Sequence, residues 1–261
     1  MPSFLIARQR SGTGALGSVL DRHPALKYVG EILHPNDRAN PVNFFRFLEA
    51  QSLASAFALM PDARKDIVQT FFDATQALHP DRQVIYDLKY NSLHHWNGGW
   101  QGILQEPWLI RHAKAGSLPI LHLTRSNLVE TFVSGRLAEL NQVWHARDRQ
   151  EVKVSSLAVN PVQLRRYLDS TTREIEQVRR WLGRYERCLE IEYAETFDAT
   201  GRMRDEVAAR LAAFLGIDAL PELNPAFVKQ APAKLSAAIE NFEEVRTALS
   251  GTPYARMVAE D

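Results

Sequence analysis

Residues 4–18 of this 261-residue chain, FLIARQRSGTGALGS, are the part of the sequence most informative about its fold. Its apolar beginning, its glycines and the apolar residues that follow predict a strand, a tight turn and a helix. Such a turn directs backbone N–H groups and a helix N-terminus toward one point, which suits a phosphate or a sulfate. Arg10 adds a positive charge within this cradle. We therefore expect the turn to bind the anionic part of a nucleotide.

A Walker loop is one interpretation of this turn. It requires G-x-x-x-x-G-K-[ST], in which the Lys meets the outer phosphates and the Ser or Thr holds magnesium. Gly12 and Gly17 have the required spacing, but Ser18 follows directly and the Lys is missing. The sequence therefore argues against an ordinary Walker NTPase.

A dinucleotide fold is the second interpretation. Residues 12–17 match G-x-G-x-x-G, and Glu31 lies nearly at the distance expected of the acid that binds the ribose. The strand, however, ends in Arg8-Gln9-Arg10, and arginine before the turn suits a terminal anionic group better than an internal pyrophosphate. An NAD(P)-binding oxidoreductase is retained as an alternative, as is a nucleotide-binding regulatory protein without turnover.

A second anion-binding element is predicted around residue 125. The segment LHLT at 121–124 is typical of a buried strand, and Arg125 follows it. Asn127 and Glu130 have the spacing of a capping box, so a helix should begin there and carry Ser134 about two turns along. Ligands of parallel sheets lie beyond the carboxyl ends of the strands, so one ligand could touch both Arg10 and Arg125.

These two elements resemble those of a known family. Residues 10–13, Arg-Ser-Gly-Thr, resemble the [KR]-S-G-[TS] segment with which sulfotransferases bind the 5′-phosphosulfate of 3′-phosphoadenosine 5′-phosphosulfate (PAPS). Arg125 and Ser134 resemble the Arg and Ser that bind its 3′-phosphate, and the family also places basic residues near Lys229 against that group. The backbone amides expected to bind the phosphosulfate belong to Ser11, Gly12, Thr13, Gly14 and Ala15.

The resemblance extends over nearly the whole chain. The segment 28–35 looks like the Gly-Glu segment of bacterial carbohydrate sulfotransferases of the Nod-factor and trehalose type, and fainter similarities lie at 214–217 and 239–254. The resemblance implies a PAPS-dependent sulfotransferase with a hydroxyl acceptor, which for these bacterial enzymes is a carbohydrate or glycolipid.

Sulfuryl transfer needs a base for the acceptor hydroxyl and a positive charge for the leaving phosphate. We expect Glu31 to be the base, with its pKa raised by burial, and His34 to be the reserve. Arg10 would neutralise the leaving 5′-phosphate. The transferred group carries less charge than a γ-phosphate, so we expect no metal site.

Strand candidates alternate with amphipathic segments along the chain. The strands are predicted at 3–8, 26–29, 84–88, 118–123 and 188–193. The helices are predicted around 13–22, 42–57, 63–77, 100–113, 127–141, 161–183, 202–215 and 234–248. This alternation predicts an α/β fold, a P-loop-like three-layer sandwich with a central parallel sheet and helices on both faces. We expect one domain over residues 1–261, with an exposed mobile loop at 143–153 that begins near Trp144. This loop is interpreted either as a lid over the acceptor or as a solvated linker.

Composition narrows the classes of partner. Lys plus Arg equals Asp plus Glu at 31 each, so the basic excess of a nucleic-acid-binding protein is absent. Cys188 is the only cysteine, which excludes an internal disulfide and favours a reducing compartment. No apolar stretch is long enough to span a bilayer, and the first glycine comes too early for a signal peptide. We expect a cytoplasmic protein whose oligomeric state, a homodimer included, the sequence leaves open.

Of three further sites, two have alternative interpretations and the third has one. Lys89 ends the third strand and is either a charge near the acceptor or transition state, or a surface lysine. The cluster from His94 to Trp100 could stack on a sugar, although aromatic core anchors are the commoner outcome. Tyr193 falls at a strand end and is interpreted as structural.

Overall fold

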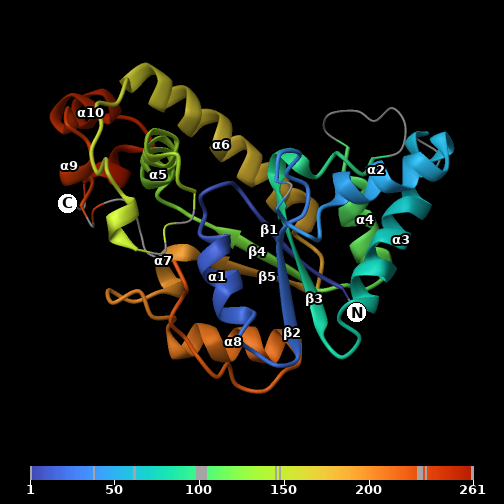
Figure 1. Cartoon of the computed structure of the whole chain (residues 1–261). Helices are drawn as coiled ribbons and strands as arrows, with labels where there is room; N and C mark the ends of the chain where they lie inside the picture. Colours follow the sequence, from blue (N-terminus) through green and yellow to red (C-terminus); the bar gives the residue numbers. More distant parts are fainter. Residues whose placement is uncertain are drawn as a thin grey trace.

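The computed structural model describes residues 2–37, 39–60, 63–97, 105–144, 146, 148–227, 232 and 234–259. These residues form a central sheet with helices on both faces (Figure 1). The sheet has five strands in the order β2-β3-β1-β4-β5, and each neighbouring pair is parallel. The predicted α/β sandwich with a central parallel sheet is confirmed.

All five predicted strands are present. They are β1 (Ser3–Ala7), β2 (Leu26–Glu31), β3 (Gln83–Lys89), β4 (Ile120–Thr124) and β5 (Cys188–Glu192). Alternate residues of a strand point to opposite faces. Phe4 and Ile6 accordingly pack into one hydrophobic cluster, and Leu5 and Ala7 into the other. Burial of both faces explains why β1 is a continuous apolar run rather than an alternating one.

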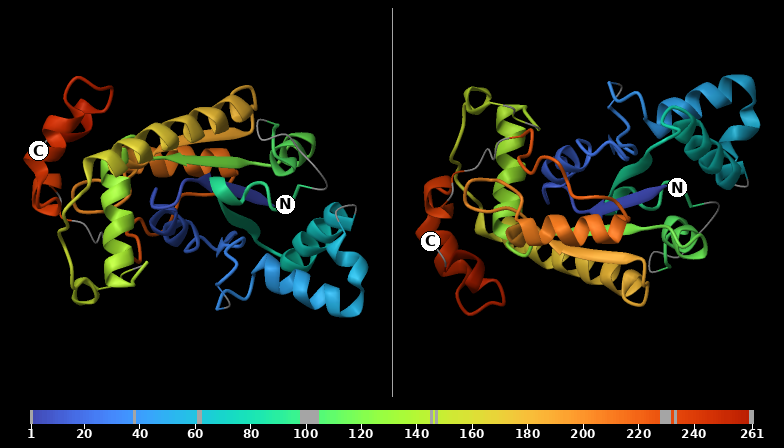
Figure 2. Two further views of the ribbon diagram at one scale, coloured as in Figure 1. Left: turned by 90° about the horizontal axis from the view of Figure 1, so that it is seen from above. Right: turned by 90° about the horizontal axis from the view of Figure 1, so that it is seen from below.

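The helices form the two outer layers. They are α1 (Thr13–Leu20), α2 (Phe44–Ala54), α3 (Arg64–Ala77), α4 (Trp108–Ala115), α5 (Leu128–Asn141), α6 (Pro161–Leu182), α7 (Tyr193–Thr196), α8 (Asp205–Leu215), α9 (Leu235–Ala238) and α10 (Phe242–Leu249). Helices α1 and α8 pack on one face of the sheet, whereas α3, α4, α5 and α6 pack on the other (Figure 2). Short 3-10 turns are η1 (Ala56–Leu59), η3 (Tyr90–Ser92), η4 (Arg149–Glu151) and η5 (Ala255–Val258). No helix in the described ranges is both long and apolar enough to cross a membrane.

The strand order bears directly on the dinucleotide alternative. In the Rossmann order, 3-2-1-4-5-6, the second strand lies beside the first, so its terminal acid reaches the ribose of a ligand held by the glycine-rich turn. In this chain β3 lies between β1 and β2. Glu31, at the end of β2, is therefore separated from the turn after β1 by a whole strand, which argues against a Rossmann dinucleotide site.

The helix predicted at 234–248 is interrupted. It consists of α9 and α10, and the break lies at Ile239, which forms a parallel bridge with Leu157. The amide of Glu240 donates to the carbonyl of Leu157 at 3.0 Å. Ile239 is buried, so the bridge is formed within the apolar core, and this tertiary pairing overrides the helical periodicity of the segment.

Candidate functional site

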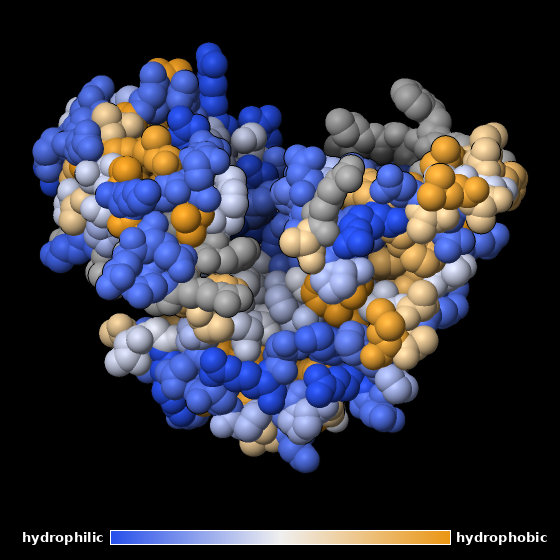
Figure 3. Space-filling model, in the orientation of Figure 1, coloured by the Kyte–Doolittle hydropathy of each residue, from blue (hydrophilic) through white to orange (hydrophobic). Residues whose placement is uncertain are grey.

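A cavity of about 960 Å³ lies at the carboxyl-terminal edge of the sheet. Its lining includes, for each of the five strands, at least one residue at the end of the strand or just after it. The sheet topology therefore brings segments that are far apart in the sequence to one cavity. Figure 3 shows the surface hollowed between the part that carries α5, α6 and α10 and the part that carries α2 and α3. This edge is where open α/β sheets bind ligands.

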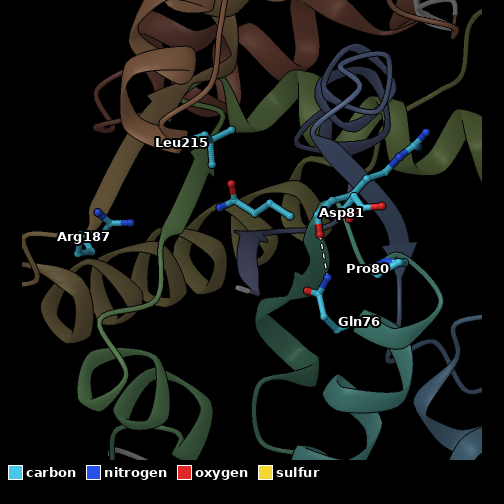
Figure 4. A pocket seen from close by; sticks show the side chains of 7 residues that line it. Gln76, Pro80, Asp81, Arg187 and Leu215 are labelled. Atoms are coloured by element: carbon cyan, nitrogen blue, oxygen red, sulfur yellow. Dashed lines mark hydrogen bonds between the residues drawn. The ribbon is translucent and has the colours of Figure 1, made fainter.

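A smaller cavity of about 340 Å³ lies at the opposite edge of the sheet (Figure 4). It is lined by residues before β3 and β5, including Asp81 and Arg187, and the side chain of Gln76 closes part of its wall by donating to the carbonyl of Arg82 at 2.9 Å. None of the predicted site residues lines this cavity.

The glycine-rich turn after β1 has a strained backbone. Arg10 has a φ of 65°, and Gly12, the N-cap of α1, has a φ of 95°. A Cβ atom on Gly12 would lie 2.2 Å from Cε2 of Tyr193, so the turn and this ring approach closely only because residue 12 is glycine.

The first residues of α1 face the cavity. Its lining includes Gly12, Thr13, Gly14 and Ala15, whose amides at a helix start have no partner within the helix. Ser11 behaves differently: its side chain is buried, it does not belong to the lining, and its amide donates to the carbonyl of Arg8 at 3.3 Å.

The guanidinium of Arg10 crosses the cavity toward α5. Its Nε and Nη2 donate to Oγ of Ser134 at 3.2 and 3.0 Å, and its Nη1 donates to the carbonyl of Trp144 at 2.7 Å. The ring of Trp144 lies 5.9 Å from the same guanidinium. Ser134 and Arg10, predicted to lie at different ends of one ligand, thus touch each other, and the loop 143–153 contributes Trp144 and Ala146 to the lining.

Arg125 lies beside Arg10. It is only 7 % exposed, and its Nη1 donates to the carbonyl oxygen of Arg10 at 3.3 Å. Its Nη2 pairs with Glu130, and its guanidinium lies over the ring of Tyr193 at 4.9 Å. Burial and the neighbouring charge of Arg125 lower the pKa of Arg10 to about 10. An anion placed between these cations would remove the repulsion, so the pair is suited to a phosphate.

A buried ion pair separates the arginines from β2. Nζ of Lys89 donates to Oδ1 of Asp87 and to Oγ1 of Thr13, each at 2.6 Å, and the hydroxyl of Tyr28 donates to Oδ2 of Asp87 at 2.6 Å. Lys89 is 5 % exposed, so its interpretation as a surface lysine is wrong. Because the pair is satisfied internally, it adds little net charge to the cavity.

Glu31 occupies the β2 end of the cavity. The pairing of β2 with β3 shifts between Tyr28 and Glu31, where Gly30 has a φ of 72°, and such an irregularity re-aims the side chain that follows it. Burial raises the pKa of Glu31, and Lys89 partly offsets this effect. A carboxylate with a raised pKa is a competent general base. His34, the reserve base, also lines the cavity.

The structure thus brings together most of the predicted site residues. Arg10, Arg125, Ser134 and Glu31 line one cavity with the start of α1, whereas Lys229 lies outside the described residues. In the aromatic cluster Trp96 is buried in the core, His95 lines the cavity and Trp100 lies outside the described residues.

Two further residues line the same cavity: Tyr193, interpreted from the sequence as structural, and Trp144, which lies in the loop predicted at 143–153. Tyr193 directly follows β5, so the rule applied to the other strand ends would have found it. For Trp144 the sequence predicted the loop but not its contact with Arg10, because that contact depends on how the loop folds.

The described part of the chain holds no group of three or more His, Cys, Asp or Glu side chains suited to a metal ion. The site therefore offers hydrogen-bond donors and cations for an anion at β1 and β4, and a carboxylate at β2. This arrangement can hold an anionic group and remove a proton beside it.

The chain is similar to a known protein. The chain is 25 % identical over 259 residues to Nodulation protein H of Rhizobium tropici, and the alignment covers 98 % of this chain and 92 % of the relative. No protein-family model matches the chain.

Proposed function

We propose that this chain transfers a sulfuryl group from PAPS to a hydroxyl group of a carbohydrate or glycolipid. The observation that carries the proposal is the convergence of Arg10 and Arg125 beside the start of α1, in a cavity whose other end holds Glu31. The similarity to Nodulation protein H agrees with the resemblance of segment 28–35 to sulfotransferases of the Nod-factor type.

The donor fits the cationic end of the cavity. Its phosphosulfate would meet the amides of residues 12–15 and the guanidinium of Arg10, and its 3′-phosphate would meet Arg125 and Ser134. To do so, the phosphates would replace the contacts that Arg10 makes with Ser134 and with the carbonyl of Trp144. Lys229, outside the described residues, is proposed to assist at the 3′-phosphate.

The proposed reaction is an in-line displacement. The carboxylate of Glu31 accepts the proton of the acceptor hydroxyl, and the acceptor oxygen forms a bond to sulfur. The bond between sulfur and the 5′-phosphate oxygen breaks, and its electron pair remains on the phosphate. The products are a sulfate ester and adenosine 3′,5′-bisphosphate, whose new negative charge lies near Arg10 and the start of α1.

The reaction is tested by incubating the protein with PAPS that carries labelled sulfate and a panel of oligosaccharides. The proposal expects labelled saccharide and an equal amount of adenosine 3′,5′-bisphosphate. Tight nucleotide binding without either product, across neutral, cationic and acidic saccharides, would instead favour the regulatory alternative. Binding of NAD(P)H, detected by its fluorescence, would favour the oxidoreductase.

A further inference from the structure

The charged side chains that line the cavity, apart from the buried pair of Lys89 and Asp87, are ordered by the sign of their charge. Two carboxylates near the arginine side, Glu130, which pairs with Arg125, and Glu192, at the end of β5, do not belong to this lining. Arg10 follows β1 and Arg125 follows β4, whereas Glu31 ends β2 and Asp37 follows it in the same wall of the cavity. Neighbouring strands lie about 4.8 Å apart, so β2 and β4, three positions apart in the sheet, are separated by roughly 14 Å. One cavity therefore has a cationic end and an anionic end.

The charged residues of β3, which lies between the two ends of the cavity, add no net charge to either end. Lys89 and Asp87, on β3, form a buried ion pair with Nζ and Oδ1 at 2.6 Å. Lys89 is thus the only cation among the described lining residues on the β2 side of Arg10, and Asp87 already neutralises it. The remaining ionisable groups of the described lining there are His34, His95 and Tyr28, whose hydroxyl donates to Oδ2 of Asp87.

Asp37 is fixed in this wall by its backbone surroundings. Its Oδ1 accepts the amide of Asn40 at 3.2 Å, and the side chain of Asn40 donates to the carbonyls of Val29 and Glu31 at 3.0 and 3.2 Å. The carbonyl of Asp37 also accepts from the side chain of Asn43 at 3.2 Å. These bonds tie the Asp37 turn to the end of β2, so its carboxylate stays near Glu31.

We propose that the acceptor is a saccharide with an ammonium group near its accepting hydroxyl, an amino sugar, and that acidic saccharides are rejected. The proposal rests on the proposed sulfuryl transfer at the same site. A polyanionic donor can occupy only the arginine end, which leaves the acceptor to the end lined by Glu31 and Asp37. An ammonium group there is attracted by two carboxylates, whereas a uronate or a sugar phosphate is repelled by both.

The test compares three tetrasaccharides of one size in calorimetry at pH 6, where the amines of a glucosamine oligomer are largely protonated, with and without saturating adenosine 3′,5′-bisphosphate. They are chitosan tetraose, which carries ammonium groups, chitin tetraose, which is neutral, and tetragalacturonic acid. We expect chitosan tetraose to bind about fivefold more tightly than chitin tetraose, as a partly exposed ion pair allows, and the acid not to bind.

Asp37→Asn removes the charge while its side-chain oxygen can still accept the amide of Asn40. It should reduce the fivefold preference to about twofold, because Glu31 remains. The matched control is Asp198→Asn, which alters a carboxylate with the same kind of turn bond, to the amide of Thr200 at 2.8 Å, outside the cavity. It should keep the preference, and thermal melting should show that both variants are folded.

Equal affinity for the cationic and neutral tetrasaccharides, or tighter binding of the acid, would overturn the inference about the acceptor. If the protein still binds the nucleotide, the proposed sulfuryl transfer is unaffected by that result. Absence of nucleotide binding would overturn the proposed function. In that case the titrations without nucleotide still decide whether this end of the cavity selects cations.

Discussion

Nη1 of Arg125 lies 3.3 Å from the carbonyl oxygen of Arg10 and donates a hydrogen bond to it, although 115 residues separate the two in the chain. The contact arises because β4 pairs directly with β1, so the segments that follow these strands emerge side by side. One ligand can therefore be held by both guanidinium groups.

Arg125→Gln should weaken the binding of adenosine 3′,5′-bisphosphate by about 10- to 100-fold, because a hydrogen bond to a charged group contributes about 1.5–3 kcal/mol. The affinity for 5′-AMP, which lacks the 3′-phosphate, should fall much less. Calorimetry with both nucleotides measures the difference. Arg136→Gln, at an exposed position of α5 paired with Glu139, is the control and should bind like the wild type. An equal loss for both nucleotides would contradict the assignment of Arg125 to the 3′-phosphate.

Gly12→Ala should abolish nucleotide binding, because its Cβ would lie 2.2 Å from Cε2 of Tyr193 and the turn would have to move. Gly201→Ala is the matched control: Gly201 also has a positive φ, of 85°, but no atom lies within 4 Å of an added Cβ. Both variants carry the backbone strain of alanine in this region, about 1 kcal/mol. Only Gly12→Ala should lose binding in titrations of folded protein, and equal affinities of the two would refute the close-approach argument.

Glu31→Gln should lower kcat by about 10²- to 10⁴-fold, the contribution of a general base, and leave nucleotide affinity nearly unchanged. Burial raises the pKa of Glu31 above its ordinary value of 4.5, and the carboxylate is the active form. The wild-type rate should therefore fall as pH decreases through a value above 4.5, and this acidic limb should be absent in the variant.

The control for this pH profile is Glu49→Gln, at an exposed position of α2. It should retain the wild-type rate and the acidic limb. A Glu31→Gln enzyme that keeps the limb would assign it to another group, with His34 the first candidate because it lines the same cavity.

The sequence was sufficient for the fold because each strand is a short apolar run bounded by turns. It also located the two arginines, since a charged residue directly after a buried parallel strand must lie at the ligand edge. It was insufficient for Lys89, because a lysine at a strand end has the same pattern whether it is exposed or paired. Side chains along β3 alternate between its two faces, so Asp87, two residues before Lys89, lies on the same face. This spacing is the only sequence feature that indicates the buried ion pair of Lys89.

The parts that sequence reasoning missed depend on tertiary contacts. The break at Ile239 is imposed by Leu157, 82 residues earlier, and no local signal marks it. Trp144 reaches the cavity because Asn141 closes the base of its loop: its Oδ1 accepts the amides of Lys153 and Val154 at 2.9 and 2.8 Å. Such long-range hydrogen bonds leave no periodicity in the sequence.

Glu190→Gln should lower the free energy of unfolding by about 1 kcal/mol at pH 7. The expected loss is small because the Glu190 side chain is 40 % exposed, so solvent screens its ion pairs. Hydrogen bonds from His122 and Arg179 lower the pKa of Glu190 to about 2 in the folded protein. A carboxyl group with a lowered pKa stabilises the fold above its ordinary pKa of 4.5, and this contribution is lost as pH falls toward 2.

Urea denaturation at pH 7 and pH 3 measures this difference. The gap between wild type and Glu190→Gln should be smaller at pH 3, and a gap of the same size at both values would show that the pKa shift is absent. Glu186→Gln, at an exposed position four residues earlier, is the control and should show no gap at either pH.

A calorimetric titration of the wild-type protein with adenosine 3′,5′-bisphosphate and, separately, with NADH tests whether Arg10 and Arg125 together bind the nucleotide of a sulfuryl donor. We predict saturable binding of the bisphosphate, one per chain and below millimolar concentration, that is lost in the double variant Arg10→Gln, Arg125→Gln. No heat from the bisphosphate, or tighter binding of NADH, would contradict the account.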